Sequence, residues 1–272
     1  MLDGGAMFGV VPKSIWQKTN PADNNNMVKI AARCLLVEEG DRLTLIDAGM
    51  GNKQSEKFFS YYHRWGEETL VSSIRKCGFS ADDVTDVFLT HLHFDHCGGG
   101  VIRIGGDSFE TTFKNAKYWS NKAHWEWATS PNKREIASFL KENFVPVEES
   151  GQLNFLKKDE NNYLTHCDLG FDVLFVDGHT EKQMIPIINF KGQKIAFAAD
   201  LIPTAGHVPL PYIPGYDIRP LTSLREKESF LNFCNDNNVL LFFEHDAFEE
   251  LGLIHQTERG IRLKSTLKLL DL

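Results

Sequence analysis

The chain has 272 residues, of which 42% are hydrophobic and 24% charged, and its formal net charge is −8. These values are ordinary for a globular protein with a large core. The acidic balance argues against a partner such as duplex nucleic acid, which needs a basic face that releases counterions. The longest apolar runs, such as Val239–Phe243, are far too short to cross a bilayer, so we expect no membrane partner.

The first residues of the chain and its cysteines indicate the cellular compartment in which we expect the protein. No basic segment followed by an apolar stretch opens the chain, so we expect no signal peptide and a cytoplasmic location. The cysteines are odd in number, scattered and without a CxxC pair, which argues against a disulfide framework or a zinc ribbon. They are Cys34, Cys77, Cys97, Cys167 and Cys234. Small buried hydrophobes in a reducing compartment are the simplest interpretation.

Apolar runs and amphipathic segments alternate along the chain. In chain order we expect strand 43–46, helix 67–77, strand 87–90, helices 121–128 and 133–143, strands 173–176 and 194–199, helix 223–235 and strand 239–243. Ser223 is the expected N-cap of the last helix, and Glu226 completes a capping box. No linker or repeat is evident. The alternation favours one α/β domain over residues 1–272, with helices outside a strand-rich interior.

The expected strands share one feature, because each ends at an acidic residue or a histidine. The residues at or just after these ends are Asp47, His91, His179, Asp200 and His245. The continuous apolar character of the runs is typical of strands whose two faces are both covered. Functional groups at strand ends are expected at the rim of a sheet.

The segment His91-Leu92-His93-Phe94-Asp95-His96 offers four metal-ligand side chains within six residues, directly after an apolar strand. A single histidine often satisfies a core hydrogen bond, but four such groups without partners would be costly to desolvate. Glycines at 98–100 permit tight turns that let the side chains converge. Imidazole and carboxylate together suit zinc, and also iron, manganese or cobalt. The strand-end residues His179, Asp200 and His245 supply further ligands.

This ordered set resembles the ligand pattern of the metallo-β-lactamase superfamily, and Asp47-Ala48-Gly49 is similar to its early Asp-x-Gly turn. The resemblance implies an αββα sandwich of two mixed sheets with outer helices and a two-metal site at one edge. It assigns His91, His93 and His179 to the first ion and Asp95, His96 and His245 to the second. Asp200 would bridge the ions, and Asp47 would hold the ligand loop from behind.

The ligand residues differ from those of other branches of the superfamily, and these differences narrow the range of expected functions. Flavodiiron oxidoreductases carry Glu at the position of His93, and the commonest true β-lactamases carry Cys at the position of Asp200. The present ligand set is that of hydrolases such as glyoxalase II, lactonases and organophosphate hydrolases. Cys97 matches no ligand of the family, so we expect it to pack in the interior.

A narrower resemblance joins the chain to the YtnP-type quorum-quenching lactonases. It is carried by residues 2–13, 90–96, Asp200-x-x-Pro203-Thr204 and 216–223. It implies hydrolysis of an N-acyl-homoserine lactone or a related cyclic ester, and it is compatible with a homodimer. The better-studied homoserine lactonases have tyrosine at the position of Pro203. Another proton donor, Tyr216 or His207, would have to replace it.

The mechanism implied is attack of a metal-bridging hydroxide on the lactone carbonyl, since two ions lower the pKa of water from 15.7 to about 7. Asp95 would be catalytic, orienting the hydroxide and passing its proton to the leaving alkoxide. We expect the pocket residues to be Met7, Phe8, Phe94, His207 and Tyr216. Core packing is the competing interpretation for the first three, and a surface position for His207.

Other functions remain open at this point. The same fold and ligands would serve a hydrolase of a phosphotriester or a thioester. Glyoxalase II is disfavoured because we find no C-terminal thiol-cofactor domain in the sequence. A non-catalytic metal-binding scaffold would have no need of an open two-metal site, and the acidic charge argues against a nuclease.

Overall fold

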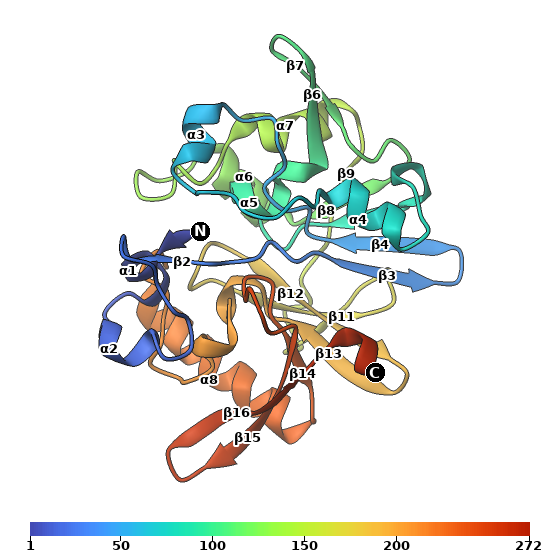
Figure 1. Ribbon diagram of the computed structural model, residues 1–272. Coiled ribbons are helices and arrows are strands. Elements are labelled where there is room, and N and C mark those ends of the chain that lie inside the picture. The colour runs from blue at the N-terminus through green and yellow to red at the C-terminus, as the bar shows by residue number, and fades with distance from the viewer. The chain divides into compact units, whose positions relative to one another are not determined.

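The computed structural model describes residues 1–272 (Figure 1). The backbone divides into two compact units. The continuous unit is Ala32–Lys158, and the split unit combines Met1–Ala31 with Asp159–Leu272. The expectation of a single hydrolase domain over residues 1–272 stays a prediction. Each unit has a principal sheet of its own, so the positions of the functional side chains follow from two separate topologies.

The continuous unit is built on a five-stranded mixed sheet with the order β3-β4-β5-β8-β9. The strands are β3 (Leu35–Glu39), β4 (Arg42–Ile46), β5 (Asp86–Phe88), β8 (Lys117–Ser120) and β9 (Leu153–Phe155). Only the β3–β4 pair is antiparallel, and β4, β5, β8 and β9 run in the same direction. Their carboxyl ends therefore share one edge of the sheet, where Asp47 follows β4 and His91 follows β5 within three residues.

The apolar runs predicted as strands 43–46 and 87–90 correspond to β4 and β5, and both are buried because the sheet is covered. Val87 and Phe88 have no exposed surface, and Leu45 and Tyr118 of the neighbouring strands are equally enclosed. A strand with both faces buried needs a continuous apolar sequence rather than an alternating one. This core fixes the strand end from which the His91–His96 segment departs.

Short helices connect these strands. They are α3 (Glu56–Ser60), α4 (Leu70–Lys76), α5 (Phe94–Cys97), α6 (Lys122–Thr129) and α7 (Val145–Glu149), with 3-10 turns η1 (Ala81–Asp83), η2 (Gly98–Gly100) and η3 (Lys141–Asn143). Side-chain caps define three of the starts, those of α3, α4 and α6. Thr69 accepts from the Ser72 backbone N–H at the start of α4, and Asn121 accepts from the His124 N–H at the start of α6. The predicted helices 67–77 and 121–128 thus overlap α4 and α6.

The helix expected over residues 133–143 is wrong. Residues 133–138 form turns, and only the 3-10 turn η3 follows. The Asn132 side chain accepts from the backbone N–H groups of Arg134 and Glu135, which is the local bonding of a turn. Glu135 is drawn into the interior, where Trp127 donates to its carboxylate. Long-range contacts of Glu135 therefore override the helical pattern.

A two-stranded hairpin, β6 (Val101–Gly105) with β7 (Ser108–Thr111), follows the glycines of η2 and projects from the continuous unit (Figure 1). Glycine is required at the start of this turn because the backbone of another loop lies against it. A Cβ at Gly98 would lie 2.2 Å from the Met50 carbonyl oxygen, and one at Gly99 would lie 2.1 Å from that of Ala48. The metal-ligand segment is thus packed directly on the loop after β4.

The split unit contains a seven-stranded sheet with the order β10 to β16. The strands are β10 (Thr165–His166), β11 (Asp172–Val176), β12 (Gln183–Phe190), β13 (Gln193–Phe197), β14 (Leu240–Phe242), β15 (Leu251–Thr257) and β16 (Gly260–Leu267). Strand β12 is antiparallel to both β11 and β13, and β13 is parallel to β14. Strands β11, β13 and β14 therefore point the same way, and their carboxyl ends precede His179, Asp200 and His245 at one edge.

The longest helix, α8 (Pro220–Asp236), contacts β15 and β16. It starts three residues before the predicted boundary, so the expected capping box of Ser223 and Glu226 is wrong. Proline stands at the first helical position, where its missing N–H costs nothing. Ser223 donates instead to Asp217, and Glu226 accepts from the backbone N–H groups of Asp177 and Gly178.

The N-terminal segment of the split unit has its own apolar cluster. Its elements are β1 (Leu2–Asp3), α1 (Gly4–Phe8), α2 (Lys13–Trp16) and β2 (Met27–Val28), and η4 (Ala199–Leu201), η5 (Ala205–His207) and η6 (Leu269–Asp271) complete the unit. Met7, Phe8, Trp16 and Val28 form the buried cluster. None of the helices combines the length and apolar character that crossing a bilayer requires.

Candidate metal centre

The His91–His96 segment leaves β5 and brings two imidazoles together at once. His91 Nε2 lies 3.0 Å from His93 Nδ1, and both rings are buried. The other nitrogen of His91, Nδ1, lies 3.1 Å from the Thr90 hydroxyl. Two ring nitrogens at this separation, each on a ring that is anchored elsewhere, form an arrangement that suits a shared cation.

Asp47 lies behind this segment, in the loop after β4, with a left-handed backbone (φ 55°) and no exposed surface. Its carboxylate accepts from the Thr90 backbone N–H at 2.7 Å and from the Thr90 hydroxyl at 2.7 Å. One of its oxygens also lies 3.0 Å from His96 Nδ1. Asp47 thereby anchors both ends of the ligand segment, while His96 Nε2 faces Asp95 Oδ1 at 3.9 Å.

Two further side chains that the sequence did not single out support the same segment. Glu135 Oε1 lies 3.5 Å from His93 Nε2, and both side chains are buried. His124 Nε2 accepts from the Leu92 backbone N–H at 2.8 Å. Neither residue lies near the motif in sequence, and no spacing rule connects them to it. Only the folded chain brings them to the ligand segment.

Phe94 interrupts the ligand motif and joins an aromatic group on the surface of the continuous unit. Its ring packs edge-on against Phe58 at 5.2 Å and against Tyr62 at 5.0 Å. All three rings are partly exposed. Burial and the nearby Asp95 carboxylate both raise the pKa of Tyr62. An apolar, partly open surface therefore begins directly beside Asp95.

In the split unit Asp200 lies between two histidines. Its Oδ2 is 3.1 Å from His179 Nε2, and its Oδ1 is 3.0 Å from His245 Nε2. His245 Nδ1 lies 2.8 Å from the Ala31 carbonyl oxygen, so its ring is anchored from behind as well. One carboxylate with each oxygen beside a different imidazole has the geometry of a bridging ligand.

Asp217, in the loop before α8, was missed by the sequence analysis and anchors His179. Its Oδ1 lies 3.0 Å from His179 Nδ1, and Ser223 donates to its other oxygen. Burial lowers the pKa of His179, but the carboxylates of Asp200 and Asp217 outweigh it and raise the pKa to about 10. The pocket around this imidazole therefore stabilises positive charge, which a divalent cation beside Asp200 would supply.

The five imidazoles that are predicted to bind metal share one arrangement. Each has one nitrogen beside an anchoring group and the other beside a second ligand atom of its own unit. The anchoring groups are Thr90, Glu135, Asp47, Asp217 and the Ala31 carbonyl. An imidazole that binds a metal ion typically donates its remaining N–H in this manner. The histidines and aspartates are thus of the kind and arrangement that hold metal ions.

The residues expected to line a substrate pocket occupy two environments. Met7, Phe8 and His207 are buried, and Phe8 stacks on both His207 and Trp16. The His207 nitrogens lie 2.7 Å from the Thr204 hydroxyl and 2.8 Å from the Met7 carbonyl oxygen. Burial lowers the pKa of His207 to about 3, so its imidazole is neutral at neutral pH. Its contribution to a pocket stays a prediction.

Tyr216 is the more accessible of the expected pocket residues in the split unit. Its ring stands edge-on to His179 at 5.5 Å, and its hydroxyl points to the Met7 sulfur at 3.8 Å. The side chain is partly exposed. The phenol of Tyr216 thus lies next to a predicted metal ligand.

Two other features lie outside this chemistry. Cys97 is buried, packs in the core of the continuous unit, and has its pKa raised to about 12 by burial.

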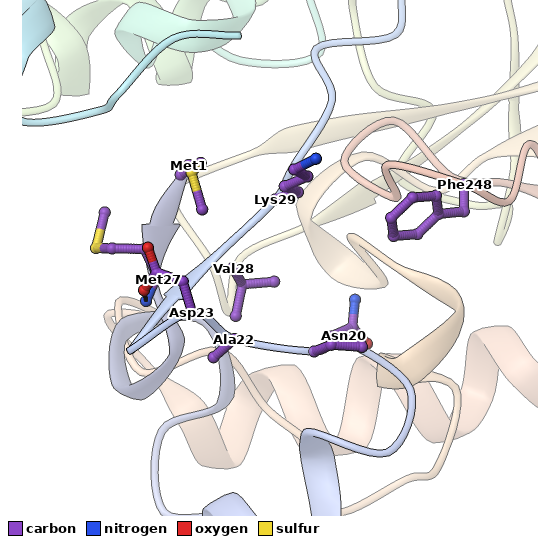
Figure 2. A pocket seen from close by; sticks show the side chains of 9 residues that line it. Met1, Asn20, Ala22, Asp23, Met27, Val28, Lys29 and Phe248 are labelled. Atoms are coloured by element: carbon purple, nitrogen blue, oxygen red, sulfur yellow. Dashed lines mark hydrogen bonds between the residues drawn. The ribbon is translucent and has the colours of Figure 1, made fainter. Parts of the chain in front are cut away.

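A hollow of about 290 Å³ in the split unit is lined by Met1, Asn20, Val28, Lys29 and Phe248, among others (Figure 2). None of the seven predicted ligands lines this hollow, so we assign it no part in the metal chemistry.

Comparisons with known proteins agree with this geometry. The model of the metallo-beta-lactamase superfamily matches residues 30–245. An N-acyl homoserine lactonase of Bacillus cereus is 25% identical over 242 residues, which cover 84% of this chain and 86% of the relative. The alignment thus includes most of both proteins.

Solved structures give the same result for the fold. A "probable metal-dependent hydrolase" from Staphylococcus aureus superposes with a TM-score of 0.86 at 26% identity, covering 98% of this chain and 92% of that one. AidC, a dizinc quorum-quenching lactonase in complex with a product, gives a TM-score of 0.76 at 22% identity, covering 97% and 90%. The expected fold class is confirmed. With a family match over most of its length, the chain belongs to the metallo-β-lactamase superfamily.

Proposed function

We propose that the seven ligands together bind two divalent ions and that the protein hydrolyses a lactone, most simply an N-acyl-homoserine lactone. Zinc is the first candidate for the metal, and iron, manganese or cobalt would suit the same donors. In this proposal His91, His93 and His179 hold one ion, Asp95, His96 and His245 hold the other, and Asp200 is shared. Asp47 keeps the ligand segment in place.

The observation that supports the proposal most strongly is the common orientation of five imidazoles. In each ring one nitrogen lies within 3.5 Å of an anchoring group, and the other faces a further predicted ligand atom within 3.9 Å. Apolar packing alone does not explain why five buried histidines orient their second nitrogens toward other polar groups. A metal-binding role accounts for all five rings with one cause.

Two bound ions would supply a hydroxide at neutral pH and polarise a carbonyl oxygen. The chain's own contribution to the chemistry centres on Asp95, which is partly exposed beside buried His96. Its carboxylate would orient the nucleophile and deliver a proton to the leaving alkoxide. Asp95→Asn should therefore lower kcat by about 10²- to 10⁴-fold while metal content stays measurable. A variant that retains both metal and rate would exclude this role.

The substrate class rests on two supports. The curated relative from Bacillus cereus and the dizinc neighbour AidC are both named as lactonases. The aromatic group of Phe58, Tyr62 and Phe94 begins beside Asp95 and is only partly buried. An apolar surface next to the reacting centre suits an acyl chain. The small-molecule ester is therefore the partner that we propose.

Pro203 is the reason to consider a second class of substrate. Three residues after Asp200 this chain has the buried Pro203, and not the tyrosine that the resemblance to homoserine lactonases implies. Tyr216, beside His179, is the replacement donor in the lactone proposal. A phosphotriester or a thioester is the alternative substrate, because a better leaving group has less need of a proton donor. The homodimer and the cytoplasmic location stay predictions.

The test is a hydrolysis panel with the zinc- or cobalt-loaded protein. It would include short and long acyl-homoserine lactones, a phosphotriester and a thioester, and it would compare the wild type with His91→Ala and His255→Ala. His255 is an exposed histidine of β15 and serves as the matched control. We expect rapid lactone opening that His91→Ala abolishes and His255→Ala preserves. Turnover of the other substrates without lactone turnover would discard the lactonase proposal and keep the hydrolase.

A further inference from the structure

The turn segment 132–139 touches the ligand segment at three points, and one of them is a buried carboxylate. The Phe94 backbone N–H donates to the Ser138 carbonyl oxygen at 2.9 Å, and the Phe139 ring lies 4.7 Å from the ring of His93. Between these contacts Glu135 Oε1 approaches His93 Nε2 at 3.5 Å. The 132–139 segment therefore packs against His93 and supplies its anchoring group from a separate loop of the continuous unit.

The Glu135 carboxylate is held in a fixed orientation. Only 3% of the residue is exposed. Trp127 Nε1 donates to Oε2 at 2.8 Å, and Asn132 Nδ2 donates to the same oxygen. These donors leave Oε1 as the oxygen directed at His93. A buried carboxylate costs free energy unless a donor or a cation compensates it, so an N–H on His93 Nε2 is the state that this environment stabilises.

The tautomer has a direct consequence for metal binding. When Nε2 carries the proton, the lone pair of His93 is on Nδ1, the nitrogen that lies 3.0 Å from His91 Nε2. A carboxylate that accepts the opposite N–H also makes an imidazole a stronger donor to a metal ion. Thr90 and the Ala31 carbonyl, which anchor His91 and His245, are neutral groups and give a weaker effect.

We propose that Glu135 is a positioning residue that fixes His93 as an Nδ1 ligand and sets the affinity of the ion held by His91 and His93. The inference rests on the proposed two-metal function but concerns binding rather than turnover. It makes the 132–139 segment a determinant of metal affinity, although this segment contributes no ligand of its own. His96, which would help to hold the second ion, is anchored by Asp47.

The test compares three variants of the full-length zinc- and cobalt-loaded protein. Glu135→Gln keeps the size of the side chain and removes its charge, and Glu135→Ala removes the group. Glu126→Gln is the matched control, because Glu126 is an exposed acid of α6, and the substitution makes the same chemical change away from His93. Stepwise competition with a chelator measures the affinity of each ion, and the visible spectrum of the cobalt protein reports the donor strength at each site.

We expect Glu135→Gln and Glu135→Ala to lower the affinity for one of the two ions by about 10- to 100-fold. The affinity for the other ion should stay nearly unchanged, and the spectrum of the cobalt protein should shift. Glu126→Gln should keep both affinities within a factor of a few. Circular dichroism of each variant separates this effect from misfolding. Wild-type affinities for both ions in folded Glu135→Gln would overturn the inference. A wild type that binds two ions but opens no lactone would discard the proposed substrate and leave this result standing.

Discussion

Asp217 is the residue through which the loop before α8 acts on His179. Its carboxylate lies 3.0 Å from His179 Nδ1 and is buried, so solvent does not screen the contact. The chain offers an internal comparison, because Asp172 lies at the same 3.0 Å from His166, whose side chain is 73% exposed. The two pairs have the same chemistry and distance and differ in burial and in their place relative to the predicted ligands.

Asp217→Asn should weaken zinc binding by about 10- to 100-fold, because the amide cannot supply the negative charge that strengthens His179 as a ligand. Asp172→Asn should leave zinc binding unchanged. Competition with a chromogenic chelator measures both variants under the same conditions. Equal zinc affinities for the two variants would show that Asp217 has no part in the metal site.

The ligands and their anchoring groups differ in how far the sequence reveals them. His91 to His96 lie in one short segment after an apolar strand, so their density alone indicates a metal site. Glu135 and Asp217 lie 42 and 38 residues from the histidines that they contact. A lone acidic residue in a polar stretch has no local pattern that separates it from a solvated side chain. These anchoring groups could be found only from the folded chain.

At the scale of elements, α8 is tied to the proline-rich loop by a buried lysine. Lys227 has no exposed surface, and its ammonium donates to the carbonyl oxygens of Pro209 and Tyr212 at 2.9 and 2.8 Å. Burial lowers its pKa to about 7, against a small opposing effect of Asp217. The loop that carries His207, Tyr216 and Asp217 is thus anchored by a group whose protonation changes near neutral pH.

This anchor gives a signed pH dependence of stability. The unfolded chain keeps the lysine protonated up to about pH 10.5, whereas the folded protein releases the proton near pH 7. The unfolded state therefore binds more protons between these values, and this group's contribution to stability rises with pH and is lost as pH falls towards 7. The free energy of unfolding of the wild type, relative to Lys227→Met, should increase from pH 7 to pH 9.

Urea unfolding at several pH values measures this difference, with the metal content held equal in both proteins. Lys194→Met is the control, because the Lys194 side chain is exposed on β13. Its difference from the wild type should stay constant with pH. The lowered pKa of the buried lysine would be contradicted if the difference in free energy of unfolding between the wild type and Lys227→Met did not change with pH, or fell as pH rises.

The sequence predicts strands better than helix boundaries in this fold, for a physical reason. The strands predicted over residues 43–46, 87–90, 173–176, 194–199 and 239–243 are largely apolar runs whose central residues are buried. Helix boundaries depend on contacts of single polar residues, and Ser223 and Glu226 illustrate this. Their spacing fits a capping box, yet Asp217 and the Asp177–Gly178 backbone are their partners in the folded chain.

At the scale of the whole molecule, the net charge and the metal site favour the same class of partner. A chain with a net charge of −8 attracts cations and repels polyanions. When they bind metal, the seven predicted ligands would be five neutral imidazoles and two carboxylates, which carry two negative charges toward two divalent ions. The superfamily match over residues 30–245 includes all seven of them. Binding of the ions to the folded chain alone would also stabilise it.

The metal content of the purified, zinc-loaded protein tests the central claim most directly. We predict two ions per chain in the wild type by elemental analysis after removal of free zinc. His91→Ala should lose one ion or bind it more weakly, and His245→Ala should do the same for the other ion. Asp200→Ala should bind both ions more weakly. His255→Ala should retain two. A wild type that holds no more than one ion, or an Asp200→Ala variant that still holds two with unchanged affinity, would contradict the two-metal account.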